Sequence, residues 1–484
     1  MDSLATDTLP ALKFITCGSV DDGKSTLIGR LLVDSTAVLQ APLAGVQRSG
    51  ETDLALLTDG LSAEREQGIT IDVAYPYFST ARRKFIIGDA PGHEQYTRNM
   101  VTAASSADCA VVLVDAIKLD WQNPALELLP QTRRHALLVN LLRVRSIVFV
   151  VNKLDAVANP DVAFVNIRTA LNAFAGAANI AVHAVIPISA LTGHNVVEAQ
   201  PGWCGYHGPA LLHLLEALPV TAADTAEALA FPVQWVEKFS AASDTQHGRR
   251  IFWGRIATGN AQPGQRLTVL PGGQTATVAY VLNHVRKHCT VPAGYSAGIV
   301  LDREVDVSRG DWLHAAPTLV TACTALPPEG PECRGSRPVG LDGTKSCCVS
   351  LQRGLQGSPC LGRPDAPAAT GLLLSREISA TVAWMDDEPL VAGRVYWALH
   401  GHRWVKARVK RIVHRLDIDT LAESDADRLE PNAIGHVELT LQDALATLPY
   451  SRSRVLGSMV LVDTASHRTS GAVLVRESLA CETQ

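Results

Sequence analysis

Gly18-Ser19-Val20-Asp21-Asp22-Gly23-Lys24-Ser25 fixes the architecture of the N-terminal part of this 484-residue chain. The stretch matches G-x-x-x-x-G-K-[ST], the phosphate-binding loop of nucleotide triphosphatases. The apolar run 12–17 before it predicts a buried strand, and residues 26–33 after it predict a helix. In that context the loop N–H groups and the helix N-terminus attract a β-phosphate. Lys24 is then expected to reach the β- and γ-phosphates, and the Ser25 hydroxyl to bind Mg²⁺.

A second motif, Asp89-Ala90-Pro91-Gly92, follows the apolar strand predicted at 84–88. An Asp at a strand end provides a water-mediated Mg²⁺ ligand, and Gly92, which has no Cβ, lets its N–H approach the γ-phosphate closely. His93 comes next and is the catalytic candidate, because its side chain can align a water with the γ-phosphorus. Thr70, in Gly68-Ile69-Thr70, is expected to complete the Mg²⁺ shell when its loop closes over the phosphate.

Two later motifs identify the base. Asn152-Lys153-Leu154-Asp155 follows an apolar run at 146–151, and a carboxylate at Asp155 can accept from N1–H and the 2-amino group of guanine. Ser189-Ala190-Leu191 follows the strand predicted at 184–188, and its backbone N–H can meet guanine O6. The alternative for N-K-x-D is a plain strand-to-helix turn with a capping Asp. We favour guanine binding because the four motifs occur in order at strand ends, where open α/β sheets bind ligands.

The predicted site therefore combines a GTP pocket with a Mg²⁺ ion and one catalytic side chain. The residues expected to contact GTP are Gly18, Ser19, Val20, Asp21, Asp22, Gly23, Lys24, Ser25, Thr26, Asp89, Ala90, Pro91, Gly92, His93, Asn152, Lys153, Leu154, Asp155, Ser189, Ala190 and Leu191. The expected Mg²⁺ ligands are Ser25, Thr70 and Asp89, and the expected catalytic residue is His93.

Composition narrows the class of protein. Hydrophobic residues make up 47% of the chain and charged residues 19%, as in globular proteins. The net charge of -5 gives no support to a general nucleic-acid binder. Residues 1–7 lack the basic region of a secretory signal, and no apolar run approaches the ~18 residues of a membrane span. Cysteines outside 317–373 are scattered singly, which indicates a reducing cytoplasm.

The motifs resemble those of a known family. Residues 89–100 resemble the second motif of translational-type GTPases. Residues 18–32 and 57–80 are more specifically similar to subunit 1 of bacterial sulfate adenylyltransferase, its GTPase subunit. Elongation factors usually carry His at the position of Asp22.

The resemblance implies an energy-coupling role. GTP hydrolysis would drive a separate catalytic subunit, subunit 2, to form adenylyl sulfate and diphosphate from ATP and sulfate, in a heterodimer or larger assembly. The adenylyl-transfer chemistry would not lie in this chain. Val20 and Ile69 would shield His93 from the nucleotide until activation. No adenylyl-sulfate kinase extension is expected, because the chain ends soon after its last predicted domain.

The expected fold is an α/β P-loop GTPase domain followed by two antiparallel β-barrel domains. Short alternating runs with Gly turns at 250–256, 266–270 and 275–281 are typical of an antiparallel barrel. Pro76 lies in a predicted strand, which should therefore be at the sheet edge. The predicted domains are 10–220, 228–316 and 374–478, with an atypical segment at 317–373.

Residues 317–373 have no counterpart in the family, whose resemblance covers about 10–316 and 374–476. The segment is rich in Cys, Pro and Gly and lacks clear periodicity. It fits a disordered insertion, or an artefact such as a shifted reading frame or unspliced sequence. A small metal-binding module is a third interpretation, although the Cys spacings match no standard zinc pattern.

Two other functions compete with sulfate activation. An elongation-factor-like GTPase would deliver an RNA ligand, and the basic stretch 402–415 could provide an RNA-binding face. We interpret that stretch instead as a strand with solvated basic side chains and apolar contacts from Trp404, Val405, Ala407, Val409, Ile412 and Val413. Asp22 and the negative net charge also argue against RNA delivery. The second alternative is a non-functional relic damaged by 317–373.

Overall fold

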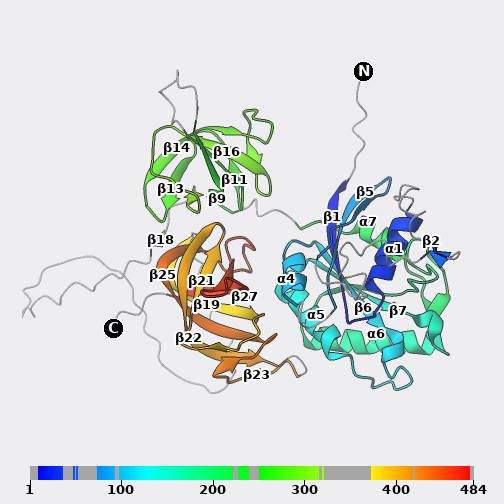
Figure 1. Cartoon of the computed structure of the whole chain (residues 1–484). Helices are drawn as coiled ribbons and strands as arrows, with labels where there is room; N and C mark the ends of the chain where they lie inside the picture. Colours follow the sequence, from blue (N-terminus) through cyan, green and yellow to red (C-terminus); the bar gives the residue numbers. More distant parts are fainter. Residues whose placement is uncertain are drawn as a thin grey trace, which may run out of the picture.

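The computed structural model arranges the chain as an α/β unit, a middle β unit and a C-terminal barrel (Figure 1). This order confirms the predicted fold class. The structure describes residues 9–35, 47–48, 51–52, 73–92, 97–221, 227–238, 250–315, 319–320, 372–417 and 420–479. The segment 317–373 therefore lies outside the described residues, apart from two short stretches at its ends.

The α/β unit is built on a six-stranded sheet in the order β4-β5-β1-β6-β7-β8. Its strands are β1 (Leu9–Cys17), β4 (Tyr77–Ser79), β5 (Arg83–Asp89), β6 (Cys109–Asp115), β7 (Ser146–Asn152) and β8 (Val182–Pro187). All neighbours are parallel except β4, which pairs antiparallel with β5 and forms an edge, as predicted. Pro76 was expected inside this strand but lies just before it, where its carbonyl accepts a hydrogen bond from the Ile87 N–H at 2.9 Å. Every residue of β6 and β7 is buried, as expected for central strands covered on both faces.

Helices cover both faces of this sheet (Figure 1). Helices α4 (Thr97–Ser105), α5 (Pro130–Leu141) and α6 (Pro160–Ala177) share one apolar core, whereas α1 (Lys24–Asp34) and α7 (Leu211–Ala217) share the other. Proline at the first position of α5 and of α6 favours helix initiation. Among the described residues, no helix is long and apolar enough to cross a membrane.

The middle β unit is an antiparallel sheet in the order β10-β11-β16-β14-β13-β17-β9. Its strands are β9 (Ala230–Pro232), β10 (Trp235–Lys238), β11 (Arg250–Arg255), β13 (Arg266–Leu270), β14 (Thr275–Leu282), β16 (Ser296–Leu301) and β17 (Trp312–His314). Alternation of buried and solvent-facing residues along β14 gives the unit one inner face. Strands at 266–270 and 275–281 were predicted from that alternation and are confirmed, with one further residue in β14.

The C-terminal barrel closes because β19 pairs with both β25 and β27. Around the barrel run β19 (Leu373–Trp384), β25 (Ile434–Thr447), β22 (Arg403–Leu416), β21 (Val395–His400), β26 (Ser458–Asp463) and β27 (Thr469–Leu479). Short accessory strands are β2 (Gln47–Arg48), β3 (Glu51–Thr52), β12 (Asn260–Ala261), β15 (Val291–Pro292), β18 (Leu319–Val320), β20 (Leu390–Val391), β23 (Glu423–Ser424) and β24 (Arg428–Leu429).

Strand β22 contains most of the basic stretch 402–415 and confirms that it is a strand. Val405, Ala407 and Val409 are buried in the barrel core. The expectation that Trp404 also supplies an apolar contact is wrong, because it is 52% exposed. The reason is the two-residue period of a strand, which turns the neighbour of inward-facing Val405 outward.

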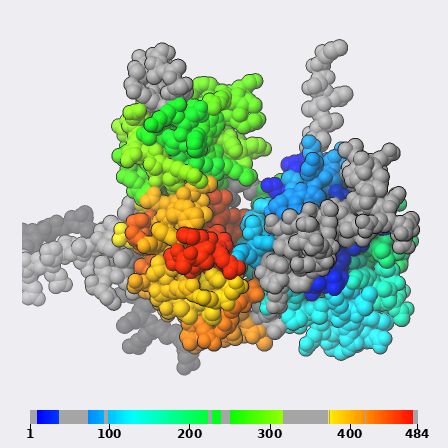
Figure 2. Space-filling model, in the orientation of Figure 1, coloured from blue at the N-terminus to red at the C-terminus, as the bar shows by residue number. Residues whose placement is uncertain are grey.

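The C-terminal barrel contacts both of the other units. Figure 2 shows the middle β unit in green above the C-terminal barrel, whose side faces the α/β unit. Tyr450 and Met385 of the barrel belong to the same apolar core as α4 and α5. The Tyr450 hydroxyl donates to the Leu142 carbonyl at 2.9 Å. Between the two β units, the Trp312 and His400 rings lie 5.3 Å apart. We call these two contacts the junctions.

Candidate functional site

The carboxyl ends of five parallel strands meet at one edge of the α/β sheet. The predicted motifs begin at these ends, and the register places Thr16 beside Asp89 and Asp115 beside Asn152. We call the segments 18–26, 89–92, 115–118, 152–155 and 189–191 the strand-end edge. The structure thus brings together all predicted motifs that it describes.

The phosphate-binding loop turns sharply between β1 and α1. Gly23 has φ +91°, a conformation that side chains rarely adopt, and a Cβ there would lie 2.5 Å from Asn152 Nδ2. Helix α1 begins at the next residue, Lys24, so its free N–H groups face the loop. Ser25 and Thr26 are half-buried in its first turn. A glycine turn followed directly by a helix N-terminus is the local geometry that the sequence predicted.

Lys24 is almost fully buried at the strand-end edge. Its Nζ donates to the carbonyls of Ser19 at 2.7 Å and Gly18 at 3.3 Å. Burial lowers the pKa of Lys24, and the nearby Asp22 and Asp89 carboxylates act in the opposite direction. A buried ammonium group favours charged oxygen ligands, and the oxygens of a phosphate are ligands of this kind.

The turn after β5 approaches the loop closely. A Cβ at Gly92 would lie 2.5 Å from Lys24 Nζ and 2.9 Å from the Ser19 carbonyl, so only glycine fits here. Asp89 is buried and accepts a hydrogen bond from the Thr16 hydroxyl at 3.2 Å. Ala90 and Pro91 complete this turn and are buried as well. The glycine therefore lets the end of β5 approach Lys24 and the phosphate-binding loop closely.

Asn152 connects three parts of the strand-end edge. Its Nδ2 donates to the Asp22 carbonyl at 2.8 Å, and its Oδ1 accepts from the Ala190 N–H at 2.9 Å. Ser189 and Leu154 are fully buried, whereas Leu191 is 67% exposed. Asp155, in the short 3-10 helix η4 (Leu154–Ala156), is exposed. The Asn side chain therefore supports the loop, while the Asp carboxylate is open to a ligand.

Sequence reasoning missed the charged group at the end of β6. Asp115 is buried and forms an ion pair with Lys153 at 2.8 Å. Lys118, in the 3-10 helix η3 (Ala116–Lys118), forms an ion pair with Asp22 at 3.0 Å. A signal was available, because Asp115 ends an apolar strand in the same manner as Asp89 and Asn152.

A buried histidine lies behind the Gly92 turn. Gln131 Nε2 donates to the Gly92 carbonyl at 3.4 Å and to Nε2 of His135 at 2.9 Å. Burial, with smaller contributions from Lys24 and Arg134, lowers the pKa of His135 to about 3. His135 is therefore neutral and supports the turn through Gln131.

Three residues of the predicted mechanism lie outside the described residues: His93, Thr70 and Ile69. Their roles stay predictions from the sequence. The described part of the site comprises the loop 18–26, the turn 89–92, and the segments 152–155 and 189–191.

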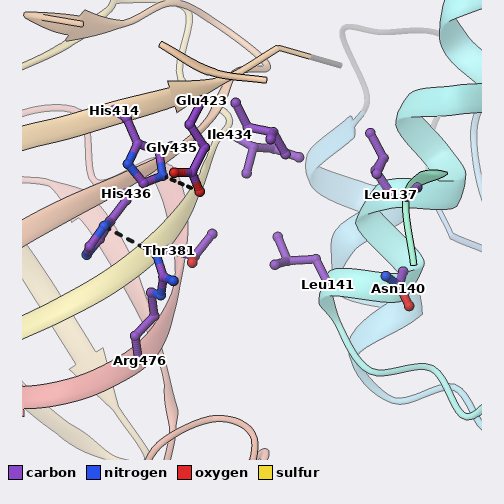
Figure 3. A pocket seen from close by; sticks show the side chains of 12 residues that line it. Leu137, Asn140, Leu141, Thr381, His414, Glu423, Ile434, Gly435, His436 and Arg476 are labelled. Atoms are coloured by element: carbon purple, nitrogen blue, oxygen red, sulfur yellow. Dashed lines mark hydrogen bonds and ion pairs between the residues drawn. The ribbon is translucent and has the colours of Figure 1, made fainter. Parts of the chain in front are cut away.

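A separate cavity of about 310 Å³ lies between α5 and the C-terminal barrel. Figure 3 shows Leu137 and Leu141 on one side and His414, His436 and Arg476 on the other. None of its lining residues belongs to the strand-end edge. This cavity is thus a feature of the junction between two units.

Comparison with known proteins agrees with this architecture. The family model for the elongation factor Tu GTP binding domain matches residues 9–224, and the GTP-eEF1A C-terminal domain-like model matches residues 377–476. The bifunctional enzyme CysN/CysC of Xylella fastidiosa is 41% identical over 98% of this chain, which spans 66% of that longer protein. Sulfate adenylyltransferase subunit 1 of Laribacter hongkongensis is 37% identical over 98% of this chain and 86% of its own length. The protein of the same name from Methylorubrum extorquens is 39% identical over 97% of this chain and 88% of its own length.

Proposed function

Because this chain belongs to the sulfate adenylyltransferase subunit 1 family, we propose that it hydrolyses GTP to drive adenylyl sulfate formation by a partner subunit. The partner would be the catalytic subunit, subunit 2, in a heterodimer or larger assembly in the cytoplasm. It would join the adenylyl group of ATP to sulfate and release diphosphate. The observation that carries the proposal is the convergence of phosphate and guanine motifs at the strand-end edge.

Guanine recognition is assigned to Asp155, assisted by the backbone at 189–191. The exposed Asp155 carboxylate can accept two hydrogen bonds from guanine. Adenine lacks those donors, so it would leave the carboxylate unpaired and lose affinity. The hydrogen bonds from Asn152 to Asp22 and from Ala190 to Asn152 hold this region against the phosphate loop.

Phosphate binding is assigned to the loop N–H groups, the α1 N-terminus and Lys24. A hydroxyl from Ser25 and a carboxylate from Asp89 are oxygen donors of the kind that Mg²⁺ prefers, and both lie at this edge. The site therefore fits the ion, and Thr70 would supply a further ligand. Bound Mg²⁺ would supply charge neutralisation at the phosphates.

We assign hydrolysis to residues that position the attacking water and stabilise charge on the phosphate. His93 would orient the attacking water, and Val20 with Ile69 would keep His93 away from the nucleotide until activation. Lys24 would stabilise charge that develops on the phosphate oxygens.

The alternative of RNA delivery has less support. Its best feature was the basic stretch that forms β22, but three of its Lys and Arg side chains already have acidic partners. Arg403 pairs with Asp311 at 3.0 Å. Lys410 pairs with Glu377 at 3.2 Å and Arg411 pairs with Glu438 at 2.6 Å. These pairs reduce the positive field that an RNA backbone needs.

The decisive experiment measures adenylyl sulfate made by the purified chain together with a catalytic sulfate adenylyltransferase subunit. Formation should require GTP, and a non-hydrolysable GTP analogue should not replace it. Equilibrium dialysis of the chain alone should show binding of GTP and not of ATP. GTP-independent formation, or equal affinity for both nucleotides, would contradict the proposal, and copurifying RNA would favour the alternative.

A further inference from the structure

A carboxylate lies inside the phosphate-binding loop. Asp22 is fully buried, and its Oδ2 accepts a hydrogen bond from the Ser19 N–H at 2.5 Å. A loop that attracts phosphate through its N–H groups is an unfavourable place for a second anion, because like charges repel strongly where water is excluded. Burial raises the pKa of Asp22, because the charged carboxylate loses its contact with water.

The compensating cation comes from a different segment. Lys118 Nζ lies 3.0 Å from Asp22 Oδ1 and also donates to the Val20 carbonyl. It lies 3.9 Å from Asp115, at the end of β6. Its side chain is 33% exposed, so the ammonium group approaches the loop from the solvent side.

A second lysine acts beside the first. Lys153 donates to the Asp21 carbonyl at 2.6 Å and pairs with Asp115 at 2.8 Å. The carbonyls of two consecutive loop residues, Val20 and Asp21, are thus held by two lysines that share one aspartate. Lys153 belongs to the guanine motif, but Lys118 belongs to none of the predicted motifs. If the lysines only held the loop in place, their hydrogen bonds to the Val20 and Asp21 carbonyls would be enough. The ion pair between Lys118 and Asp22 also brings a positive charge to the loop.

We propose that Lys118 is a positioning residue that neutralises Asp22 and thereby allows the loop to accept the phosphates of a guanine nucleotide. The inference rests on the proposed function, because it concerns the same GTP site. Without Lys118 the Asp22 carboxylate would oppose the nucleotide, and the Val20 carbonyl would lose its lysine donor. Removing the carboxylate as well should therefore restore affinity.

The test is a double-mutant cycle on nucleotide affinity. A fluorescent GDP analogue and GTP, each with Mg²⁺, are titrated into wild type, Lys118→Met, Asp22→Asn and the double variant. Lys118→Met should weaken binding about tenfold or more, and Lys118→Arg should keep it within about threefold, since both lysine and arginine are cations. The double variant should recover most of the loss. Lys84→Met, on the exposed side of β5, is the matched control and should bind as wild type does.

Two results would overturn the inference. If the double variant binds as weakly as Lys118→Met, Lys118 does not act through Asp22. If Lys118→Met binds as wild type does, the lysine has no role in binding. Should Lys118→Met not fold, Asp22→Asn alone remains informative, because it should bind more tightly than wild type, and weaker binding would refute the inference. Absence of GTP binding by wild type would instead refute the proposed function.

Discussion

The strand-end edge and the junctions both join segments that lie far apart in the sequence, but they use opposite kinds of groups. At the strand-end edge, the buried Asp22 and Asp115 are paired with lysines, and the buried Lys24 donates to two backbone carbonyls. At the junctions, the buried Tyr450 and His400 are neutral, and the charged side chains, such as Arg454 and the Arg403–Asp311 ion pair, are only half-buried. Tyr450 makes one hydrogen bond to a carbonyl, and His400 makes one to the Leu456 carbonyl at 3.1 Å.

This difference follows from what each region does. Buried charges are costly, and a set of apolar side chains of the same volume would often be equally or more stable. The buried charges of the strand-end edge are understandable if a highly charged ligand binds there. Apolar packing is sufficient where protein meets protein, and Met385 and Tyr450 provide it against α4 and α5. Substitutions at the strand-end edge should therefore change nucleotide affinity strongly. Substitutions at the junctions should cause smaller changes, in the free energy of unfolding, that do not depend on the ligand.

The largest effect is expected for Lys24→Ala. Loss of the buried ammonium group removes the cation that faces the phosphates, and tight GTP binding should be lost, by about a thousandfold or more. Isothermal titration with Mg²⁺ and GTP measures the affinity, and Lys84→Ala is the control on the same sheet. If Lys24→Ala bound GTP within tenfold of wild type, the strand-end edge would not be the phosphate site.

Asp155→Asn should change which base is preferred. An amide at this position offers a donor where guanine also has donors, so xanthosine triphosphate should gain relative to GTP by about a thousandfold. Competition binding of the two nucleotides measures the ratio. Asp161→Asn, an exposed carboxylate change in the first turn of α6, should leave the ratio unchanged. An unchanged ratio in Asp155→Asn would contradict the assignment of guanine recognition.

Most of the fold could be predicted from the sequence because its signals are local. The apolar runs at 146–151 and 266–270 set β7 and β13, and the glycines of the phosphate loop set the turn before α1. The position of β4 at the sheet edge followed from Pro76. The stretch 402–415 was recognised as a strand, but its inward and outward positions were not distinguished, which is why Trp404 was grouped with Val405.

The candidate site was predicted as a set of motifs, and its supporting contacts were not. Lys118 and Asp22 are 96 residues apart, and nothing in the pattern around either residue specifies the other. Similarly, the Tyr450 hydroxyl meets a carbonyl 308 residues away, through packing of complete units. Such contacts depend on how separate elements and units pack against each other. The spacing of apolar residues within one segment does not specify that packing. The functional roles of the motif residues stay predictions.

The first junction prediction concerns pH. His400 is fully buried, and its Nδ1 has no hydrogen-bond partner among the described residues. Burial lowers the pKa of His400 to about 4, although the Leu456 carbonyl acts in the opposite direction. The folded pKa is below the unfolded value of 6.5, so the unfolded state binds the proton first as pH falls. Stability is therefore complete above about pH 6.5 and is lost progressively toward about pH 4, by roughly 3 kcal/mol.

Urea unfolding across this pH range, in wild type and His400→Gln, measures the effect. The glutamine can still donate to Leu456 but does not titrate, so its stability should fall less steeply with pH. His183→Gln, at an exposed histidine on β8, is the control and should keep the wild-type slope. Identical slopes in wild type and His400→Gln would show that the junction contains no buried neutral histidine.

The smallest effect is expected for Tyr450→Phe. The change removes the 2.9 Å hydrogen bond to Leu142, whose carbonyl keeps Arg454 as a donor at 3.0 Å. Because the acceptor stays satisfied and the ring still packs, the free energy of unfolding should fall by only about 1 kcal/mol. Urea unfolding measures this, with Tyr77→Phe, at a tyrosine that is 81% exposed, as the control. GTP affinity should not change, since the hydroxyl that is removed bonds to Leu142, which lies outside the strand-end edge. A tenfold loss of GTP affinity in Tyr450→Phe would contradict this contrast between the two regions. It would show that the junction is coupled to nucleotide binding and does not only hold two units together.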